Sequence, residues 1–589
     1  MKYFRVLSVL FFFVLFIASC GEDKKVQQIP DNEETSTDSD AEELTDNYEH
    51  ANDNETQETD DTVSETDEDI NDEEPLETVE FDIPDPAVEN HEAVIVTKDE
   101  FAQIFSEMAA FHTMTGINTK VITIETICAG TLCNDEDPKK DTAKAVKDHI
   151  RFIPGLKYLI LGGDIEVVPS RKVHDKYSNV MAGTFEDDFQ SDFYYADFSD
   201  WDSNGNGIYA EDADILDYSA EIAVGRIPVS TVEEALVYFE KLIKHNTDYN
   251  TSHVKSSLLI ANVATNFSGI DINAGYYFET EGRTRDIIPF DFFKRKLYTK
   301  TFPSPANDAE PLNNDVMKQA LEGGVNVVVH NGHGYPTLLS CEQANNDNNF
   351  TSEMAYALKN TTFPIFLSCA CQAGQFEAPF EYTYEYNGET KTRVFTDDAA
   401  GEKLVNAPEG GSVFYLGNAI TGLGLAGGSQ FIDEMLRDMF TKPFSVMGQS
   451  YLFAHNALKK NDTFAPPIPA VPAVPVVDED SWKWTKKGVV ALGSPLVTFW
   501  RDPFPAINAV IGVTSEKVMN GYSFTLSIPD ELAGFDLRIY SNGKFYTLSA
   551  VMPGTETLNI EGEDSNILFA LLKPDHQPFF QKTGLMVWL

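Results

Sequence analysis

The chain has 589 residues, a formal net charge of −51 and 42% hydrophobic residues. This length is enough for two to four domains with hydrophobic cores, and the strong negative charge argues against nucleic acid as a partner. About half of the charge comes from residues 21–90, which contain 28 acidic residues and two lysines.

The first 20 residues have the features of a targeting segment. Lys2 and Arg5 precede the apolar run 6–18, which is shorter than a membrane-spanning helix requires. Small residues then lead to Cys20, an arrangement that resembles a bacterial lipoprotein signal with Cys20 as the lipidated first residue of the mature chain. An ordinary secretory signal that happens to contain a cysteine is the alternative. We expect a lipoprotein of the outer membrane or cell surface, facing the periplasm or the exterior.

Residues 21–90 are expected to form an acidic, disordered tether. Their composition offers too little apolar surface for a core, and repulsion between the carboxylates extends such a chain. A spacer between membrane and enzyme is the simpler interpretation, and a sink for cations is the weaker one.

From residue 91 the pattern alternates between strand and helix. The chain-order signals are strands at 93–97, 119–124, 158–161, 222–226, 257–261, 325–330, 363–367, 412–416 and 489–492, with helices at 98–115, 142–153, 231–245, 315–322 and 429–440. Such a βαβ rhythm predicts an α/β fold with a parallel sheet. We divide it into two α/β subdomains, residues 91–250 and 251–503. Short alternating runs then predict a small β-sandwich over residues 504–589.

Five cysteines remain once Cys20 is set aside, and an odd number in an exported chain predicts at least one unpaired thiol. Cys128 and Cys133 flank a short loop, so a local disulfide between them is one of the possibilities.

Two short motifs follow neighbouring predicted strands. His333 lies between two glycines after the strand 325–330, and Cys371 begins a turn of small residues after the strand 363–367. Ligands and chemistry collect beyond the carboxyl ends of parallel strands. A neutral imidazole can accept the proton of a thiol, and a thiolate is a good nucleophile. The pair therefore indicates base and nucleophile, whereas His330 and Cys369, nearer to the strands, are interpreted as core residues.

The order of these motifs resembles that of gingipain-type cysteine peptidases. The resemblance rests on the segments 158–164, 191–197, 224–228, 332–334 and 371–376 and runs from about residue 92 to residue 503. It implies a caspase-like α/β catalytic body followed by an immunoglobulin-like β-sandwich. It also implies that Cys371 forms a thioacyl intermediate, that His333 is general base and acid, and that the backbone N–H groups of Gly334 and Cys371 stabilise the oxyanion.

Asp192 matches an acidic position near the catalytic centre of that family. The resemblance implies that Asp192 orients His333, or that it lines the pocket for the residue before the scissile bond, where it would favour Arg or Lys. An ordinary loop carboxylate is the alternative, since Asp192 follows several other acidic residues.

The segment 200–211 has the spacing of a calcium loop. Oxygen-bearing side chains occupy positions one, three and five, glycine follows at position six, and glutamate stands at position twelve. Isoleucine at position nine and the lack of clear flanking helices separate it from an EF-hand. We predict a structural calcium ion held by Asp200, Asp202, Asn204, Asn206 and Glu211, with a solvated acidic turn as the alternative. No cofactor is expected for catalysis.

Taken together, these features predict a cysteine endopeptidase that acts on proteins or peptides and is attached to a membrane through its lipid. Two other functions use the same fold: a catalytically idle adhesion or binding lipoprotein, and a transpeptidase that passes the acyl group to an amine.

Overall fold

The computed structural model describes residues 91–583, apart from residues 132, 138–139, 180–182, 248–252, 263–265, 268–269, 272–273, 300–307, 342–347, 387–388, 425–426, 443, 460–478, 504–510, 519, 542–543, 562–566 and 574–575. The predicted signal segment, Cys20 and the acidic tether therefore lie outside the described residues. Within the described part, no helix is long and apolar enough to cross a membrane.

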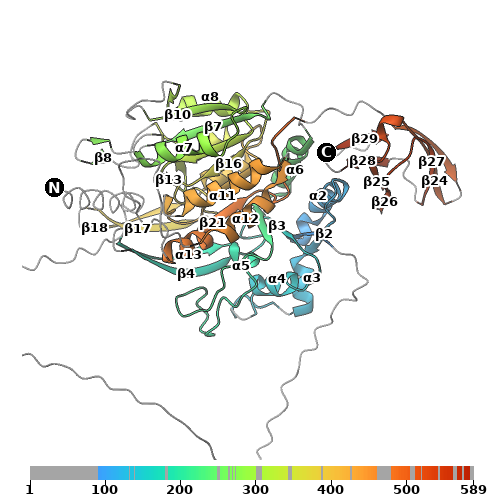
Figure 1. Cartoon of the computed structure of the whole chain (residues 1–589). Coiled ribbons are helices and arrows are strands. Elements are labelled where there is room, and N and C mark those ends of the chain that lie inside the picture. Colours follow the sequence, from blue (N-terminus) through green and yellow to red (C-terminus); the bar gives the residue numbers. More distant parts are fainter. Residues whose placement is uncertain are drawn as a thin grey trace, which may run out of the picture. The chain divides into compact units, whose positions relative to one another are not determined.

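One mixed sheet organises the body (Figure 1). Its eleven described strands follow the order β11 (Glu310–Pro311), β10 (Phe293–Tyr298), β7 (Ser256–Ala261), β12 (Val327–Asn331), β16 (Ile365–Ser368), β19 (Phe414–Asn418), β21 (Val489–Leu492), β6 (Ala223–Ile227), β3 (Tyr158–Gly162), β1 (Ala93–Thr97) and β2 (Thr119–Thr123). The predicted α/β fold is confirmed. The strands from β11 to β19 are parallel to one another, and so are those from β21 to β2.

The sequence did not reveal how the two halves of the sheet meet. Strand β21 runs antiparallel to β19 and parallel to β6, which it meets at Leu492 and Arg226. The strands of the two halves therefore run in opposite directions, and the hydrogen bonds between β19 and β21 join the halves into one sheet. The boundary expected near residue 250 separates the strands of the two halves in sequence except for β21, which comes from the end of the body but runs parallel to β6, and the strands of both halves belong to one sheet.

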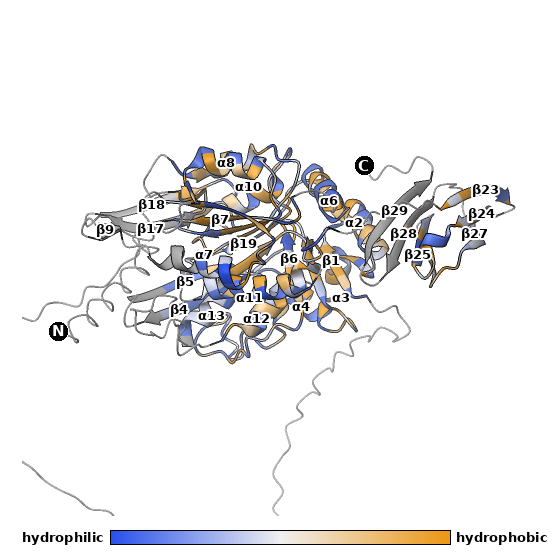
Figure 2. Ribbon diagram, turned by 45° about the horizontal axis from the view of Figure 1, so that its top comes forward, coloured by the Kyte–Doolittle hydropathy of each residue, from blue (hydrophilic) through white to orange (hydrophobic). Residues whose placement is uncertain are grey.

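The central strands have apolar sequences because they are buried. Every residue of β1, β6, β7, β12, β16, β19 and β21 is buried, as parallel strands covered on both faces require. Figure 2 shows the hydrophobic colouring on strands such as β7 and β19. The buried side chains join into one large core.

Among the helices of the body, α2, α6, α10 and α9 form one connected group and α7, α11 and α12 form another, while α3 packs on α4 and α13 on α5. Helices α7, α11 and α12 lie in front of the sheet in Figure 1. Their bounds are α2 (Ala102–Met114), α3 (Ile124–Thr131), α4 (Thr142–Ile150), α5 (Phe193–Ala196), α6 (Val232–Thr247), α7 (Ala274–Asp286), α8 (Asn314–Glu322), α9 (Ser352–Tyr356), α10 (Ala400–Asn406), α11 (Gly428–Thr441), α12 (Met447–Ala457) and α13 (Glu479–Gly488). Side-chain caps stabilise the starts of three helices: Asp141 accepts from Lys144 N before α4, Asn313 accepts from Val316 N before α8, and Thr351 accepts from Met354 N before α9.

Two long hairpins lie in segments for which the sequence predicted no strand. Strands β4 (Arg171–Asn179) and β5 (Gly183–Ser191) pair with each other in the stretch of chain that connects β3 to β6. Strands β17 (Phe380–Tyr386) and β18 (Glu389–Phe395) pair in the stretch that connects β16 to α10. Their acidic and polar residues hide a strand signal, because partly exposed strands need not be apolar. Smaller pairings join β8 (Asn266–Phe267) to β9 (Ile270–Asp271), β14 (Leu338–Leu339) to β13 (Gly334–Tyr335) and β15 (Phe350–Thr351), and β20 (Phe444–Val446) to β22 (Thr498–Trp500).

The C-terminal segment forms two antiparallel sheets around a core of its own. One contains β23 (Gly512–Val518), β24 (Gly521–Ile528) and β27 (Gly554–Glu561). The other contains β26 (Lys544–Leu548), β25 (Asp536–Ser541), β28 (Ile567–Lys573) and β29 (His576–Thr583). The immunoglobulin-like assignment stays a prediction.

The cysteines follow the pattern that the sequence allowed. Cys128 and Cys133 form a disulfide with their Cα atoms 5.0 Å apart. Cys341, Cys369 and Cys371 are buried thiols.

Candidate active site

The loops that carry His333 and Cys371 leave the same edge of the sheet. Strands β12 and β16 are parallel neighbours, with Val329 opposite Leu367 and His330 opposite Ser368. His333 follows the end of β12 by two residues, and Cys371 follows the end of β16 by three. The register of two adjacent strands therefore places the two motifs beside each other.

Gly334 shows how closely the two loops approach. A Cβ atom at this position would lie 2.8 Å from Ala370 Cβ and 3.1 Å from the carbonyl oxygen of Cys371. No side chain fits at such distances, so glycine is required for the loop after His333 to lie against the backbone of Cys371. The two glycines around His333 that drew attention in the sequence thus have a packing reason.

Both side chains are largely enclosed: His333 is 6% exposed and Cys371 is 4% exposed. The Cys371 Sγ atom lies 3.5 Å from the carbonyl oxygen of Gly422, which it can reach as a weak donor. The next residue, Gln372, has a left-handed backbone with φ of 56°. A non-glycine residue in this region is strained, and the surrounding structure must hold it.

Backbone hydrogen bonds hold the strained turn. Gln372 N donates to the carbonyl of Ile420, and Gly374 N donates to that of Asn418, at 3.0 and 3.1 Å. The side-chain amide of Asn418 donates to the carbonyl of Ala370 at 2.9 Å. The thiol is therefore presented by a turn fixed on the end of β19.

The structure places His330 and Cys369 in the core, as the sequence indicated. His330 is fully buried, and its Nδ1 atom shares a hydrogen bond of 2.9 Å with Ser368 Oγ. Burial lowers the pKa of His330 to about 3, so its imidazole is neutral at physiological pH. Cys369 is 2% exposed and its sulfur lies 3.7 Å from Asn331 Oδ1.

Arg283 on α7 anchors the end of β12, a role that the sequence did not suggest. Its Nη1 donates to Asn331 Oδ1 at 2.7 Å, its Nη2 to the carbonyl of Ser429 at 2.8 Å, and its Nε pairs with Asp433. Arg283 is 1% exposed. A guanidinium with this many fixed partners ties the start of the His333 loop to α7 and α11.

Helix α10 joins the two loops to each other. Ala400 N donates to the carbonyl of Pro336 at 2.6 Å, and Gly401 N donates to the carbonyl of Ala373 at 2.8 Å. These N–H groups have no partner inside a helix that starts at Ala400, so they are available for contacts outside it. The first turn of α10 therefore bridges the His333 loop and the Cys371 loop.

Asp192 lies in a buried ion pair. Arg226, which is fully buried, donates from Nε and Nη2 to the two carboxylate oxygens of Asp192 at 2.7 and 2.8 Å. Arg226 Nη1 donates to the carbonyls of Gly163 and Val168, and its guanidinium carbon lies 4.9 Å from the centroid of the Phe376 ring. Asp192 therefore reaches the Cys371 loop through Arg226 and Phe376.

Two more carboxyl groups share the surroundings of Arg226. Burial raises the pKa of Asp164 to about 6, and the nearby charge of Arg226 opposes that rise. Burial, together with Asp164 and Asp398, raises the pKa of Glu402 well above its ordinary value. Glu402 accepts from Ala399 N at 2.9 Å and so caps α10. The first turn of α10 therefore contacts both loops and also adjoins this buried cluster of charges.

The segment predicted to hold calcium is a turn whose side chains bond to backbone N–H groups of the turn and to each other. The amide nitrogens of Asn204 and Asn206 donate to Glu211 Oε1 at 2.6 Å each, and Asp202 accepts from Gly207 N. Asp200 accepts from Asp202 N at 3.2 Å. Across the described residues, no group of three or more His, Cys, Asp or Glu side chains is arranged to hold a metal ion. The calcium site stays a prediction from the sequence, and no step below involves a metal.

The comparisons with known proteins agree with this fold. They show that the protein is a cysteine peptidase with a caspase-like α/β fold. The family model of Peptidase family C25, the gingipain family, matches residues 87–500. Because this match covers well over half of the chain, the chain belongs to Peptidase family C25.

Two solved structures resemble the chain over most of its length. The Arg-specific cysteine proteinase gingipain R is 14% identical with a TM-score of 0.52, covering 84% of this chain and 97% of that structure. The complex of the pro- and mature domains of Porphyromonas gingivalis RgpB gives 14% identity and a TM-score of 0.51, with coverages of 83% and 99%. At this identity the likeness shows the fold. An uncharacterized protein of Archaeoglobus fulgidus is 23% identical over 332 residues, which are 53% of this chain and 74% of the relative.

Proposed function

We propose that the chain hydrolyses peptide bonds as an endopeptidase, with Cys371 as nucleophile and His333 as general base and acid. The observation that carries the proposal is the contact between the two loops. A Cβ atom on Gly334 would lie 3.1 Å from the carbonyl oxygen of Cys371, so the residue next to His333 packs against Cys371 itself. Membership of a cysteine peptidase family supports the same assignment.

The chemistry follows from these groups. The imidazole of His333 takes the proton of the Cys371 thiol, and the sulfur adds to the carbonyl carbon of the scissile bond. The carbonyl oxygen becomes an oxyanion, for which the backbone N–H groups of Gly334 and Cys371 are the proposed donors. The C–N bond then breaks, and His333 gives its proton to the leaving amine. Water, deprotonated by His333, hydrolyses the thioacyl intermediate and regenerates the thiol.

We assign Asp192 a positioning role. Arg226 takes both oxygens of its carboxylate, so the negative charge is compensated before any substrate arrives. The pair touches the ring of Phe376, five residues after the nucleophile. This arrangement supports fixing the Cys371 loop more than it supports binding a substrate cation, which a free carboxylate would do better.

The first test is Cys371→Ala, assayed with a library of fluorogenic peptides under reducing conditions. We expect cleavage to fall by at least about 10³-fold, because the covalent step is lost. Cys369→Ala is the matched control, since its sulfur is assigned to the core. Cleavage that survives Cys371→Ala would refute the nucleophile. An added amine acceptor separates hydrolysis from transpeptidation by product mass. Absence of any His333-dependent alkylation of Cys371 would favour an idle binding protein.

A second test concerns the contact between the loops. Gly334→Ala forces Ala370 or the Cys371 carbonyl to move, so we expect kcat/KM to fall roughly 10- to 100-fold, since misplacement by about 1 Å has this effect. Gly282→Ala in α7 is the control, because nothing lies within 4 Å of a Cβ atom there. It should leave activity unchanged and stabilise the fold by up to about 1 kcal/mol. Equal activity of both variants would contradict the close approach.

We also propose attachment of the protein to a membrane through a lipid on Cys20. The support is the sequence alone, a basic start and a short apolar run before a cysteine. Cys20→Ser expressed in a bacterial host should move the protein from the membrane fraction to the soluble fraction. Unchanged fractionation would contradict the anchor.

A further inference from the structure

A second histidine, His330, lies between the strands that lead to His333 and Cys371. Its side chain is fully buried on β12, and its Nδ1 atom is 2.9 Å from Ser368 Oγ on the neighbouring strand β16. The two residues are opposite each other in the register of β12 and β16. The imidazole therefore joins the ends of the two strands, although the chemistry proposed above gives it no task.

Ser368 extends this contact to the turn that presents the thiol. Its Oγ atom accepts from Ala370 N at 3.2 Å, and the carbonyl of Ala370 accepts from the Asn418 side chain at 2.9 Å. A hydroxyl donates one hydrogen bond and accepts two, so Ser368 can donate to His330 Nδ1 while it accepts from Ala370 N. Because Ala370 directly precedes Cys371, the hydrogen bond with His330 orients the hydroxyl that holds the turn.

The other nitrogen of the imidazole faces the histidine loop. A Cβ atom on Gly332, the residue before His333, would lie 2.7 Å from His330 Nε2 and 3.1 Å from its Cε1. Glycine is therefore required where this ring packs against the chain that leads to His333. The charge of His333 also contributes, after burial, to the lowered pKa of His330, as expected for two imidazoles that lie close together.

Ala370 is the residue at which the two loops meet. A Cβ atom on Gly334 would lie 2.8 Å from Ala370 Cβ. The imidazole thus packs against the glycine before His333, and its partner Ser368 holds the residue that meets the glycine after it. One side chain is therefore connected to the backbone on both sides of the proposed base and to the residue before the proposed nucleophile.

The chemistry of the position favours a neutral side chain with a hydrogen-bonding nitrogen. His333 becomes an imidazolium when it takes the thiol proton, and a second positive charge beside it would oppose that step. Because burial lowers the pKa of His330 to about 3, His330 brings no such charge at neutral pH. An aliphatic side chain would also be neutral, but it would leave the hydroxyl of Ser368, which is 2% exposed, without this partner.

We propose that His330 is a positioning residue of the active site, which holds the Cys371 turn and the His333 loop in register through Ser368 Oγ and Gly332. The proposal rests on the peptidase function proposed above. It adds to that function a residue that acts through its neighbours. A packing role alone needs only a side chain of suitable size, whereas positioning needs the hydrogen bond at Nδ1.

Two substitutions of equal size separate these roles. Leucine and asparagine branch at the same atom and have the same number of side-chain heavy atoms, so His330→Leu and His330→Asn leave a similar space unfilled. Asparagine keeps a hydrogen-bonding atom at the same number of bonds from the backbone as Nδ1, and leucine does not. Packing alone favours leucine, because burial of a polar amide is costly. The hydrogen bond to Ser368 favours asparagine.

The measurements are kcat for a fluorogenic peptide and the rate at which iodoacetamide alkylates Cys371, with tandem mass spectrometry to distinguish this label from one on Cys369. We expect His330→Leu to lower both rates roughly 10- to 100-fold, since a displacement of about 1 Å has this effect. KM should change by less than about 3-fold, because substrate binding does not use the imidazole. His330→Asn should recover both rates to within about 5-fold of the wild type.

Ser368→Ala tests the same hydrogen bond from its other end. It should resemble His330→Leu. The variant with both substitutions should lose no more than about 3-fold beyond the larger single effect, because the two residues act through one contact. Ser368→Ala also keeps the proposal testable if His330→Leu does not fold, since it leaves the imidazole in place.

His112→Leu is the matched control. His112 is 1% exposed, burial lowers its pKa to about 3 as well, and it lies on α2, which packs against β2 and α6. Its loss should leave kcat and the alkylation of Cys371 unchanged. Thermal unfolding of each variant sets the temperature below which its rates are measured on folded protein.

The outcomes separate the two proposals. Rates for His330→Leu that equal those of the wild type, or that equal or exceed those of His330→Asn, would overturn the positioning role. Unchanged rates in Ser368→Ala would overturn it too. These results leave the peptidase proposal intact as long as Cys371→Ala abolishes cleavage. If Cys371→Ala cleaves as well as the wild type, the peptidase proposal fails, and the alkylation rates still decide whether His330 positions Cys371.

Discussion

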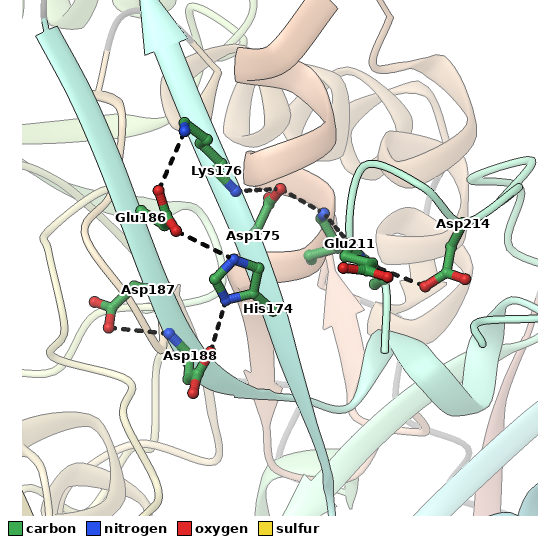
Figure 3. Close-up of polar contacts among 10 residues, drawn as sticks. His174, Asp175, Lys176, Glu186, Asp187, Asp188, Glu211 and Asp214 are labelled. Carbon is green, nitrogen blue, oxygen red and sulfur yellow. Dashed lines mark hydrogen bonds and ion pairs between the residues drawn. The ribbon is translucent and has the colours of Figure 1, made fainter. Parts of the chain in front are cut away.

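Two acidic regions of this protein use carboxylates in opposite ways. Behind the Cys371 loop, Asp192 is 7% exposed and both its oxygens are taken by Arg226. A pocket of about 320 Å³ between β4 and the start of α13 is lined by six acidic residues and two lysines, part of which Figure 3 shows, and two of the acidic residues, Asp212 and Asp217, are exposed. The charge of Asp192 is balanced by one buried arginine, whereas the lining of the pocket has more carboxylates than lysines, and of these Asp175 is paired with Lys487.

The difference teaches that burial decides what an acidic residue can do. A buried carboxylate must find its partner in the fold, because an unpaired charge in the interior is expensive. Once paired, it fixes neighbouring elements, as the Asp192–Arg226 pair does for Gly163, Val168 and Phe376. An exposed carboxylate is solvated and can stay unpaired until a cation arrives.

The strongest way to break this comparison is Arg226→Met. It leaves the Asp192 carboxylate buried without its partner, so we expect the free energy of unfolding to fall by about 3–5 kcal/mol in urea denaturation. Lys359→Gln, which removes an ion pair with Glu409 whose side chains are 68% and 66% exposed, is the control and should cost at most about 1 kcal/mol. Similar losses in the two variants would show that Arg226 contributes no more to the stability of the fold than an exposed ion pair does. Adding Asp192→Leu to Arg226→Met should restore much of the loss.

A smaller effect should appear in the pH dependence of stability. The pKa of Asp164 is raised to about 6 in the folded protein, so the folded state keeps a proton that the unfolded state releases from about pH 4 upward. The sign is therefore a loss of stability as pH rises from about 4 to about 6, by roughly 1–3 kcal/mol. Asp164→Asn should remove this component, and urea midpoints of both proteins across pH 4–7 measure it. Parallel pH profiles would contradict the raised pKa.

The smallest effect sharpens the other side of the comparison. Asp212→Asn with Asp217→Asn should change the free energy of unfolding by less than about 0.5 kcal/mol, because exposed side chains contribute little to the fold. Thermal unfolding of this variant beside the wild type is the measurement. A loss of several kcal/mol would mean that these carboxylates stabilise the fold, as the buried Asp192–Arg226 pair is expected to do.

The sequence by itself determined the fold class, the buried strands and the two motifs. Runs such as 325–330 and 363–367 are apolar because both faces of their strands are covered, and this covering makes their signal independent of distant partners. Local chemistry also separated His330 and Cys369, close to their strands, from His333 and Cys371 in the turns. The hairpins β4–β5 and β17–β18 escaped prediction, because their stability comes from pairing and not from an apolar pattern.

Only the tertiary structure decided how these parts are combined. The reversal at β21, the pairing of Asp192 with Arg226 and the bridge from α10 to both loops join residues that are far apart in sequence. A linear pattern records how apolar a segment is, but not which segment covers it. For the same reason Asp192 and Asp212 look alike in the sequence, and only their different burial separates a carboxylate that pairs within the fold from one that is exposed to solvent.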